Sequence, residues 1–372
     1  MLLIANVVAL LLGVLVSAGT LPTAIRVGRH LGAVDAPGGR RSHRGDIPRL
    51  GGIGIFSGFV VGVGAALLIA GRARSLGDPT SDFPWAGAGL GAAIIFVAGL
   101  LDDLRQFRPR TKFLLQFLAA GVAIAFGVRI DSVGVPFLDV IQLGAWSPIV
   151  TMAWLLVITN AMNLIDGLDG LAGGLGLIVT TTMAFIALGG EHYGIVMCAV
   201  GLAGALIGFL WYNFNPARIF MGDGGSQFLG FMLALISIRG SAKGATAVAL
   251  SLPILLMGVP LLDLTTTVAR RALRGPAEGS VGPNTILHRI SRADREHLHH
   301  NLLDLGWSPR RAVLLLYLIA SGFALAAYLS LTRSSLPVAG VLLILSIACV
   351  ATIKLAPGVL RAQAPPGPSD GP

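Results

Sequence analysis

Five aspartates lie where long apolar stretches of this chain break. Asp102 and Asp103 follow GAAIIFVAGLL, Asp166 and Asp169 lie in NAMNLIDGLDGLAGG, and Asp223 lies in RIFMGDGGS. A carboxylate at the end of a membrane span is costly to keep, so such a residue is a functional suspect by default. Several carboxylates on one side of a membrane would attract a divalent cation and hence a phosphate. The sequence therefore predicts a membrane protein with an acidic site at its span ends.

The composition favours a polytopic membrane protein. Of 372 residues, 54% are hydrophobic and only 12% are charged, whereas a soluble domain has roughly a quarter charged residues. We expect an all-α fold, with a single integral membrane domain over residues 1–355 and a Pro/Gly-rich, disordered tail over 356–372. Apolar windows near the length that crosses a bilayer predict eleven helices at about 2–24, 51–71, 85–101, 112–128, 148–163, 172–188, 193–211, 225–238, 245–264, 312–330 and 336–353.

Basic residues predict the orientation of the chain. Eleven spans place alternate connecting segments on opposite sides, and one set of segments contains 21 of the 27 Lys and Arg residues. Because cytoplasmic loops are enriched in Lys and Arg, this set is predicted to be cytoplasmic, with the N-terminus outside and the C-terminus inside. All five aspartates then fall on the cytoplasmic side. The external segment 131–146 is turn-rich and alternates in part, which predicts a short hairpin or interfacial element.

The formal charge of +9 follows from the same positive-inside bias. Nothing in the sequence resembles a base-reading module, so nucleic acid is not an expected partner.

A basic loop, DAPGGRRSHRGDIPRLGG at residues 35–52, enters the second predicted span. Its density of Pro and Gly favours a fixed shape over a loose linker. Arg40, Arg41, His43 and Arg49 could face anionic phosphates or lipid headgroups. An ordinary basic loop that follows the positive-inside rule is the alternative.

The Asp102–Asp103 pair ends one predicted span, and Lys112 opens the next span on the same side. Adjacent side chains on a helix point about 100° apart, so the two carboxylates do not chelate one ion as a simple pair. They suit different tasks, one facing a metal and the other a proton or a second substrate. Lys112 could hold a phosphate as a point charge. The alternative is that the pair is merely solvated.

Polar residues at a spacing of three lie at the end of the fifth predicted span and just beyond it. Asn160, Asn163, Asp166 and Asp169 share one face if the helix continues. Four polar groups in a stripe are hard to explain as packing, while the glycines between them indicate a broken helix where backbone can approach a ligand. The pattern does not match an EF-hand.

A glycine-rich loop, NFNPARIFMGDGGS at residues 213–226, surrounds Arg218 and Asp223. The GK[ST] element of a Walker A loop is absent. Asp223 could be only a helix N-cap, but the presence of the other carboxylates favours a metal role.

Three of the chain's seven histidines, His297, His299 and His300, lie within four positions of the longest cytoplasmic loop, beside Arg295. A zinc site is the alternative, but the sequence has no HExxH motif and no nearby Cys. The flanking arginines better fit an anionic sugar nucleotide.

Taken in order, these motifs resemble the polyprenyl-phosphate N-acetylhexosamine-1-phosphate transferase superfamily, glycosyltransferase family 4. The motifs DxPxxRxxHxxxxPRxGG, DD, NxxNxxDGxDGL, NPARxFMGDxGS and HxHH extend over essentially the whole chain. Within the superfamily the chain looks like the WecA/TagO branch, since it has REHLHHNLLDLGWS where the branch that makes lipid I shows a PIHHHFE-like run. One departure is Arg41, where many relatives have Lys.

The resemblance implies an enzyme of the bacterial plasma membrane whose active site faces the cytoplasm. It would transfer N-acetylglucosamine-1-phosphate from UDP-GlcNAc to undecaprenyl or another polyprenyl phosphate and release UMP, with Mg²⁺, or else Mn²⁺, as cofactor. This is the first membrane step of a cell-envelope glycan pathway, and a homodimer is one expected assembly. The open alternatives are another UDP-N-acetylhexosamine or UDP-MurNAc-pentapeptide as donor and, in a different class, a secondary transporter, which would place its acids mid-span.

The resemblance also implies roles for individual residues. Asp102, Asp103, Asp166 and Asp169 would be catalytic, with Asp102 positioning or deprotonating the lipid phosphate. The expected metal ligands are Asp103, Asn163 and Asp223. Together with the motifs above, the resemblance predicts substrate contacts from Arg40, His43, Lys112, Asn160, Arg218, Arg295, His297, His299 and His300.

Overall fold

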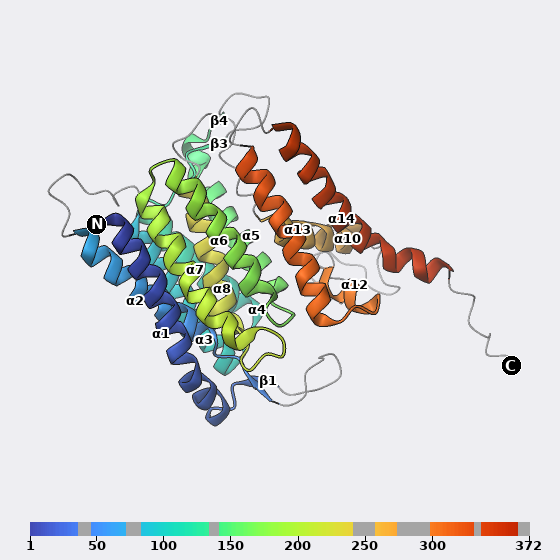
Figure 1. Cartoon of the computed structure of the whole chain (residues 1–372), viewed down its shortest axis with the longest axis horizontal. Coiled ribbons are helices and arrows are strands. Elements are labelled where there is room, and N and C mark those ends of the chain that lie inside the picture. Colours follow the sequence, from blue (N-terminus) through green and yellow to red (C-terminus); the bar gives the residue numbers. More distant parts are fainter. Residues whose placement is uncertain are drawn as a thin grey trace.

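The computed structural model describes residues 1–35, 46–71, 83–133, 141–240, 257–273, 298–330 and 336–363, with side chains left undescribed at 239–240, 267–273, 298–300 and 355–363. It is an all-α structure with two short strand pairs (Figure 1). The helices are α1 (Leu2–His30), α2 (Gly52–Gly71), α3 (Trp85–Arg105), α4 (Pro109–Ala125), α5 (Ser147–Ile165), α6 (Leu171–Gly189), α7 (Tyr193–Asn213), α8 (Gly222–Gly240), α10 (Gly258–Leu273), α12 (Leu298–Asp304), α13 (Pro309–Leu329) and α14 (Leu336–Gln363).

Eight apolar helical segments in the described part of the chain are long enough to cross a membrane, which confirms the predicted multi-pass, all-α character. They are formed by α1, α2, α3, α5 with its preceding turn, α6, α7, α13 and the first part of α14. The predicted windows at 112–128 and 225–238 correspond to α4 and α8. The window at 245–264 is described only from residue 257, where α10 follows, so the count of eleven spans stays a prediction.

The end of α14 differs from the predicted domain boundary. The helix continues to Gln363, eight residues beyond position 355, and so covers the start of the segment that composition assigned to a disordered tail. The physical reason is that VLRAQ, at 359–363, is compatible with a helix. The remaining part of that predicted tail, 364–372, lies outside the described residues.

Helices α1 to α8 form one bundle. The buried face of α1 is built mainly from small residues, including Ala5, Ala9, Gly13 and Ser17, and it packs against α2 and α7. Small residues let helix backbones approach closely where lipid supplies no hydrophobic driving force between helices. A tight three-helix wall results on one side of the bundle.

Helix α8 lies at the centre of the bundle and packs against α3, α5, α6 and α2. Its described side chains from Gly225 onward are buried, and Phe228 and Phe231 are among the largest fully buried residues of the structure. A helix surrounded on all sides can expose a polar residue to a substrate only at an end, and the N-terminal turn of α8 contains Asp223.

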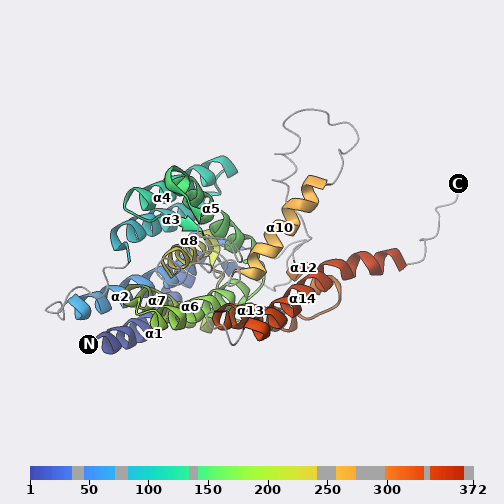
Figure 2. The same cartoon turned by 90° about the horizontal axis from the view of Figure 1, so that it is seen from above.

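The C-terminal helices lie to one side of this bundle. Helix α13 packs against α6, α10 and α14, while α10 also packs against α5. Both views show the end of α14 extending away from α1–α8 (Figures 1 and 2). A buried ion pair joins Asp263 on α10 to Lys354 on α14, with 2.5 Å between Oδ1 and Nζ.

The two strand pairs mark opposite ends of the bundle (Figure 1). Strand β1 (Val34–Asp35) pairs antiparallel with β2 (Ile47–Pro48) beside the C-terminal end of α1. Strand β3 (Ser132–Val133) pairs with β4 (Ile141–Gln142), which confirms a hairpin within the segment 131–146; a 3₁₀ turn, η1 (Gly144–Trp146), follows it.

Candidate active site

The carboxylate of Asp103 caps the N-terminus of α8. Its Oδ1 accepts the backbone N–H of Asp223 at 2.8 Å, and its Oδ2 accepts that of Gly224 at 2.9 Å. The first N–H groups of a helix have no partner within the helix, and a carboxylate also favours the positive end of the helix dipole. A Cβ on Gly99 would lie 2.6 Å from the Asp223 carbonyl oxygen, so glycine is needed for α3 to approach this closely. The predicted alternative, Asp223 as the N-cap, is therefore wrong.

The basic loop that enters α2 is bonded to the segment before α8. The backbone N–H of Phe220 donates to the Pro48 carbonyl at 2.8 Å, and the N–H of Gly51 donates to the Phe220 carbonyl at 2.9 Å. This pairing brings Arg49 to the start of α8, where its positive charge interacts with the Asp103 carboxylate. Two predicted motifs that are far apart in the sequence thus share one backbone framework.

Lys112, near the start of α4, lies between two carboxylates. Its Nζ donates to Asp223 Oδ2 at 2.6 Å and forms an ion pair with Asp102. The second oxygen of Asp102 accepts the backbone N–H of Phe107 at 2.5 Å. The structure therefore separates the tasks of the two adjacent aspartates, as their different directions on a helix require. Asp103 binds the first amides of α8, whereas Asp102 binds Lys112 and the Phe107 amide at the end of its own helix.

Asn163, on the last turns of α5, completes the surroundings of the Asp223 carboxylate. Its Nδ2 donates to Asp223 Oδ1 at 2.8 Å and to Ser226 Oγ at 2.8 Å. Each oxygen of the Asp223 carboxylate therefore has its own donor, Lys112 for Oδ2 and Asn163 for Oδ1. The amide oxygen of Asn163 is not used in these bonds.

Asn160 lies one helical turn deeper than Asn163. Its Nδ2 donates to the Leu156 carbonyl and to Gln116 Oε1, both at 2.8 Å. Gln116 in turn donates to Gln227. Asn160 thus belongs to an internal amide network, and its predicted contact with substrate stays untested.

The predicted polar stripe does not continue as one helix. Helix α5 ends at Ile165 and α6 begins at Leu171, with Gly170 at φ +81° between them. Asp169 lies in this break, and its Oδ2 accepts the Asn215 amide at 2.9 Å and the backbone N–H of Ala217 at 3.0 Å. The interpretation as a broken helix is confirmed, and Asp169 ties this break to the glycine-rich loop before α8.

Asp166 directly follows α5 and lies within electrostatic reach of three other acids. Desolvation by the surrounding protein, reinforced by the charges of Asp223, Asp103 and Asp169, raises the pKa of Asp166 to about 8. The five aspartates therefore lie in one region of the molecule, three of them held by direct bonds around the start of α8.

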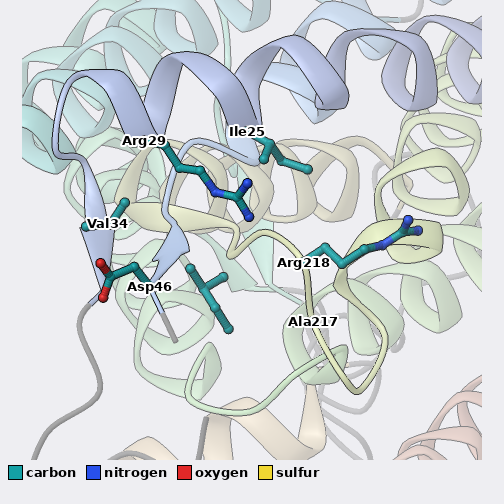
Figure 3. Close-up of a pocket in the computed structure, with 7 residues that line it drawn as sticks. Ile25, Arg29, Val34, Asp46, Ala217 and Arg218 are labelled. Carbon is teal, nitrogen blue, oxygen red and sulfur yellow. The ribbon is translucent and has the colours of Figure 1, made fainter. Parts of the chain in front are cut away.

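Arg218 lies at the edge of this region, where its guanidinium group stacks 4.4 Å from the Tyr212 ring centroid and donates to the Trp211 carbonyl at 3.0 Å. It borders a surface hollow of about 750 Å³ between the end of α1 and the strand pair β1–β2. Figure 3 shows Arg29 extending into this hollow from α1, with Asp46 and Arg218 on either side of it.

Several predicted site residues cannot be placed. Arg40, His43, Arg295 and His297 lie outside the described residues, and His299 and His300 belong to α12 without described side chains. In the part of the chain that is described, no three His, Cys, Asp or Glu side chains form a metal-binding group.

Comparisons with known proteins identify the family of the chain. The sequence model of glycosyl transferase family 4 matches residues 85–241, the region from α3 to the end of α8. The chain is 38% identical over 322 residues to the probable undecaprenyl-phosphate N-acetylglucosaminyl 1-phosphate transferase of Bacillus subtilis (strain 168), covering 86% of this chain and 84% of that protein.

Two more relatives have related names. The decaprenyl-phosphate N-acetylglucosaminephosphotransferase of Mycobacterium tuberculosis (strain H37Rv) is 38% identical over 350 residues, which cover 87% of this chain and 82% of the relative. The undecaprenyl-phosphate alpha-N-acetylglucosaminyl 1-phosphate transferase of Yersinia pestis is 28% identical over 309 residues, 81% of this chain and 78% of the relative. The chain therefore belongs to glycosyl transferase family 4.

Proposed function

We propose that this protein transfers N-acetylglucosamine-1-phosphate from UDP-GlcNAc to undecaprenyl phosphate or another polyprenyl phosphate. The observation that carries the proposal is the convergence of four helix ends on one charged cluster, in which Lys112 pairs with Asp102 and Asp223 and the Asp103 carboxylate binds the start of α8. The names of the relatives supply the substrate classes. Such a cluster at the end of a membrane bundle suits a reaction between a soluble nucleotide and a lipid phosphate.

The reaction is a phosphoryl transfer. An oxygen of the lipid phosphate forms a bond to the β-phosphorus of the sugar nucleotide, the bond from that phosphorus to the bridging oxygen breaks, and UMP leaves with the electron pair. No covalent bond to the protein is required, and we favour direct attack. The protein must then mainly position two anions and offset their repulsion.

Two basic residues of the described chain are suited to that task. Lys112 brings a positive charge between carboxylates that would otherwise repel a phosphate. Arg49 lies beside the start of α8, where its positive charge interacts with the Asp103 carboxylate. In this proposal, Lys112 binds a phosphate as a point charge, and the planar guanidinium group of Arg49 binds phosphate oxygens.

The residues around Asp223 fit Mg²⁺. They present oxygen donors without sulfur, which a hard cation prefers, and Mg²⁺ is commonly held by one or two carboxylates together with waters and substrate phosphates. A sparse set of protein ligands is therefore sufficient. In this proposal the ligands are Asp223, the free amide oxygen of Asn163 and Asp103, whose oxygens keep lone pairs beside their amide bonds. The bound ion would neutralise charge on the diphosphate.

The other acids have distinct proposed tasks. Asp102 orients Lys112 toward the lipid phosphate. The Asp102 carboxylate can also accept a proton from that phosphate. Asp169 fixes the break between α5 and α6 against the loop at 215–217, which shapes the edge of the nucleotide site. Arg218 lies next to this edge and borders the hollow. Its guanidinium group offers positive charge to the nucleotide.

The membrane context completes the proposal. We place the site on the cytoplasmic face of a bacterial plasma membrane, because the basic segments of the chain gather on the side of the aspartates. A homodimer stays a prediction, which the mass of the detergent-solubilised protein would test.

Purified protein tests the function directly. We expect UMP release when the protein is given undecaprenyl phosphate, Mg²⁺ and UDP-GlcNAc, and less release with other UDP-N-acetylhexosamines or UDP-MurNAc-pentapeptide. A lipid product that retains the sugar and both phosphates would establish the transfer. No UMP release with any of these donors would overturn the proposal.

A further inference from the structure

A second polar layer lies directly beneath the charged cluster. It consists of Gln116 on α4, Asn160 on α5 and Gln227 on α8, which we call the amide layer. Asn160 Nδ2 donates to Gln116 Oε1 at 2.8 Å, and Gln116 Nε2 donates to Asn160 Oδ1 at 3.4 Å and to Gln227 Oε1 at 3.2 Å. Gln116 and Gln227 are only 5% and 3% exposed. Three helices are therefore cross-linked inside the bundle by side-chain amides.

Each member of the amide layer lies one helical turn from a residue of the outer site. Gln116 follows Lys112 by four residues, and Gln227 follows Asp223 by four, while Asn160 precedes Asn163 by three. Residues at these spacings lie on the same helix face. The outer residues Lys112, Asn163 and Asp223 join the same three helices, α4 to α8 and α8 to α5, whereas the amide layer joins α5 to α4 and α4 to α8. Two bonded layers of the same three helices are thus stacked.

Packing alone does not account for the amide layer. Burying an amide costs free energy that its hydrogen bonds only offset, and an apolar side chain of similar size, such as Met or Leu, would fill the same space. A bonded amide group does something that an apolar one cannot, because it fixes the rotation and axial position of each helix relative to the others. Such buried polar networks favour one arrangement over alternatives of similar packing.

We propose that the amide layer positions Lys112, Asn163 and Asp223 for phosphoryl transfer. Gln116, Asn160 and Gln227 act as positioning residues that do not touch the substrate, so Asn160 is reassigned from its predicted substrate contact. The inference rests on the proposed function. A shift of roughly 1 Å at such a site costs about 100-fold in rate, so loss of the layer lowers kcat while the charged residues remain in place.

The first test removes the amide bonds without changing the size of the side chain. In Gln116→Met we expect kcat for UMP release to fall about 10- to 100-fold. The KM for UDP-GlcNAc should change by less than about threefold, because the residues that bind the nucleotide keep their charges. Ser237→Ala is the matched control, since it removes a partly buried bond between the same helices α5 and α8, from Trp154 Nε1 at 3.0 Å, far from the amide layer. Its kcat should stay near that of the unmodified protein.

The second test exchanges the two amides. Gln116→Asn and Asn160→Gln each change the length of one partner, and the double variant restores the total length of the pair. We expect each single variant to lose kcat and the double variant to recover at least threefold over the poorer single, with the bond to Gln227 still missing. Recovery of kcat distinguishes positioning from a change of local polarity.

Thermal unfolding of every variant separates positioning from folding. A normal kcat in Gln116→Met would overturn the inference, and so would a loss of kcat that Ser237→Ala reproduces at equal loss of stability. A double variant no better than either single would also count against it. Failure of the proposed function has a different signature, because the unmodified protein would then release no UMP in the same assay.

Discussion

Lys112 and Asp223, 111 residues apart in the chain, are joined by a 2.6 Å hydrogen bond between Nζ and Oδ2. The same ammonium group forms an ion pair with Asp102. One cation therefore links the end of α3 and the starts of α4 and α8. Its removal would leave two carboxylates facing an anionic substrate, so Lys112 is a sensitive point of the site.

We predict that Lys112→Met lowers UMP release by about 100-fold or more, because a charge that stabilises the transferring phosphate is lost. Lys112→Arg keeps the charge but spreads it over a larger planar group, and it should retain more activity than the Met variant. The measurement is the initial rate of purified protein at saturating substrates. Equal rates for Lys112→Met and unmodified protein would exclude a role in transfer.

Asp102→Asn and Asp223→Asn should each abolish transfer in membranes while leaving expression intact. Asp102 holds Lys112, whereas Asp223 is the proposed centre of the metal site, so their metal dependence should differ. With EDTA the unmodified protein should lose activity and recover it on addition of Mg²⁺. Any residual activity of Asp223→Asn should need more Mg²⁺ for half-maximal rate, and that of Asp102→Asn should not. Near-normal turnover in either variant would exclude its assigned role.

Asp103→Asn tests the capping of α8. The Asn side chain keeps one acceptor oxygen but turns an NH₂ group toward a backbone N–H, so one of the two amide bonds is lost. Loss of a helix cap costs about 0.5–2 kcal/mol, and the start of α8 with Asp223 should become less well positioned. We expect a lower midpoint of thermal unfolding together with reduced kcat. A variant of unchanged stability would show that the cap contributes little.

Much of the fold follows from apolar periodicity alone. Ten of the eleven predicted windows correspond to described helices, because about 20 apolar residues have few other stable conformations in a membrane. The partners of Asp103 could not be predicted in this way, since they lie 120 and 121 residues away on another helix. The break after Ile165 was only indicated by glycines, because local spacing fits a continuous helix as well as a broken one.

Gln116 and Gln227 show what the motifs leave out. Neither residue is part of a charged cluster, and an isolated Gln on an apolar helix has no local pattern that distinguishes it. A signal was nevertheless present, since each lies four residues after a predicted site residue, Lys112 or Asp223, and so on the same helix face. Which helices they join depends on packing that one sequence does not reveal.

Asp166 should give the protein a pH-dependent stability. Its carboxyl group ionises near 3.8 in an unfolded chain, but near 8 in the folded protein. Between these values the folded state binds one more proton than the unfolded state, so the contribution of Asp166 to stability falls as pH rises from about 4 to about 8. In EDTA, the midpoint of thermal unfolding should therefore decline more over this range in unmodified protein than in Asp166→Asn. Parallel curves for the two proteins would contradict the prediction.

Arg49→Gln should weaken binding of the sugar nucleotide. Arg49 is held at the start of α8 by the pairing of Pro48 and Gly51 with Phe220, and its charge acts on Asp103. Loss of this charge beside two phosphates should raise the KM for UDP-GlcNAc about tenfold. This factor corresponds to the free energy that about one charge-assisted hydrogen bond contributes to binding. Arg49→Lys should retain part of the effect. Arg105→Gln, which removes an exposed positive charge from the last turn of α3, is the matched control. If both Gln variants raise KM equally, general attraction of the anion accounts for the effect and Arg49 has no specific role.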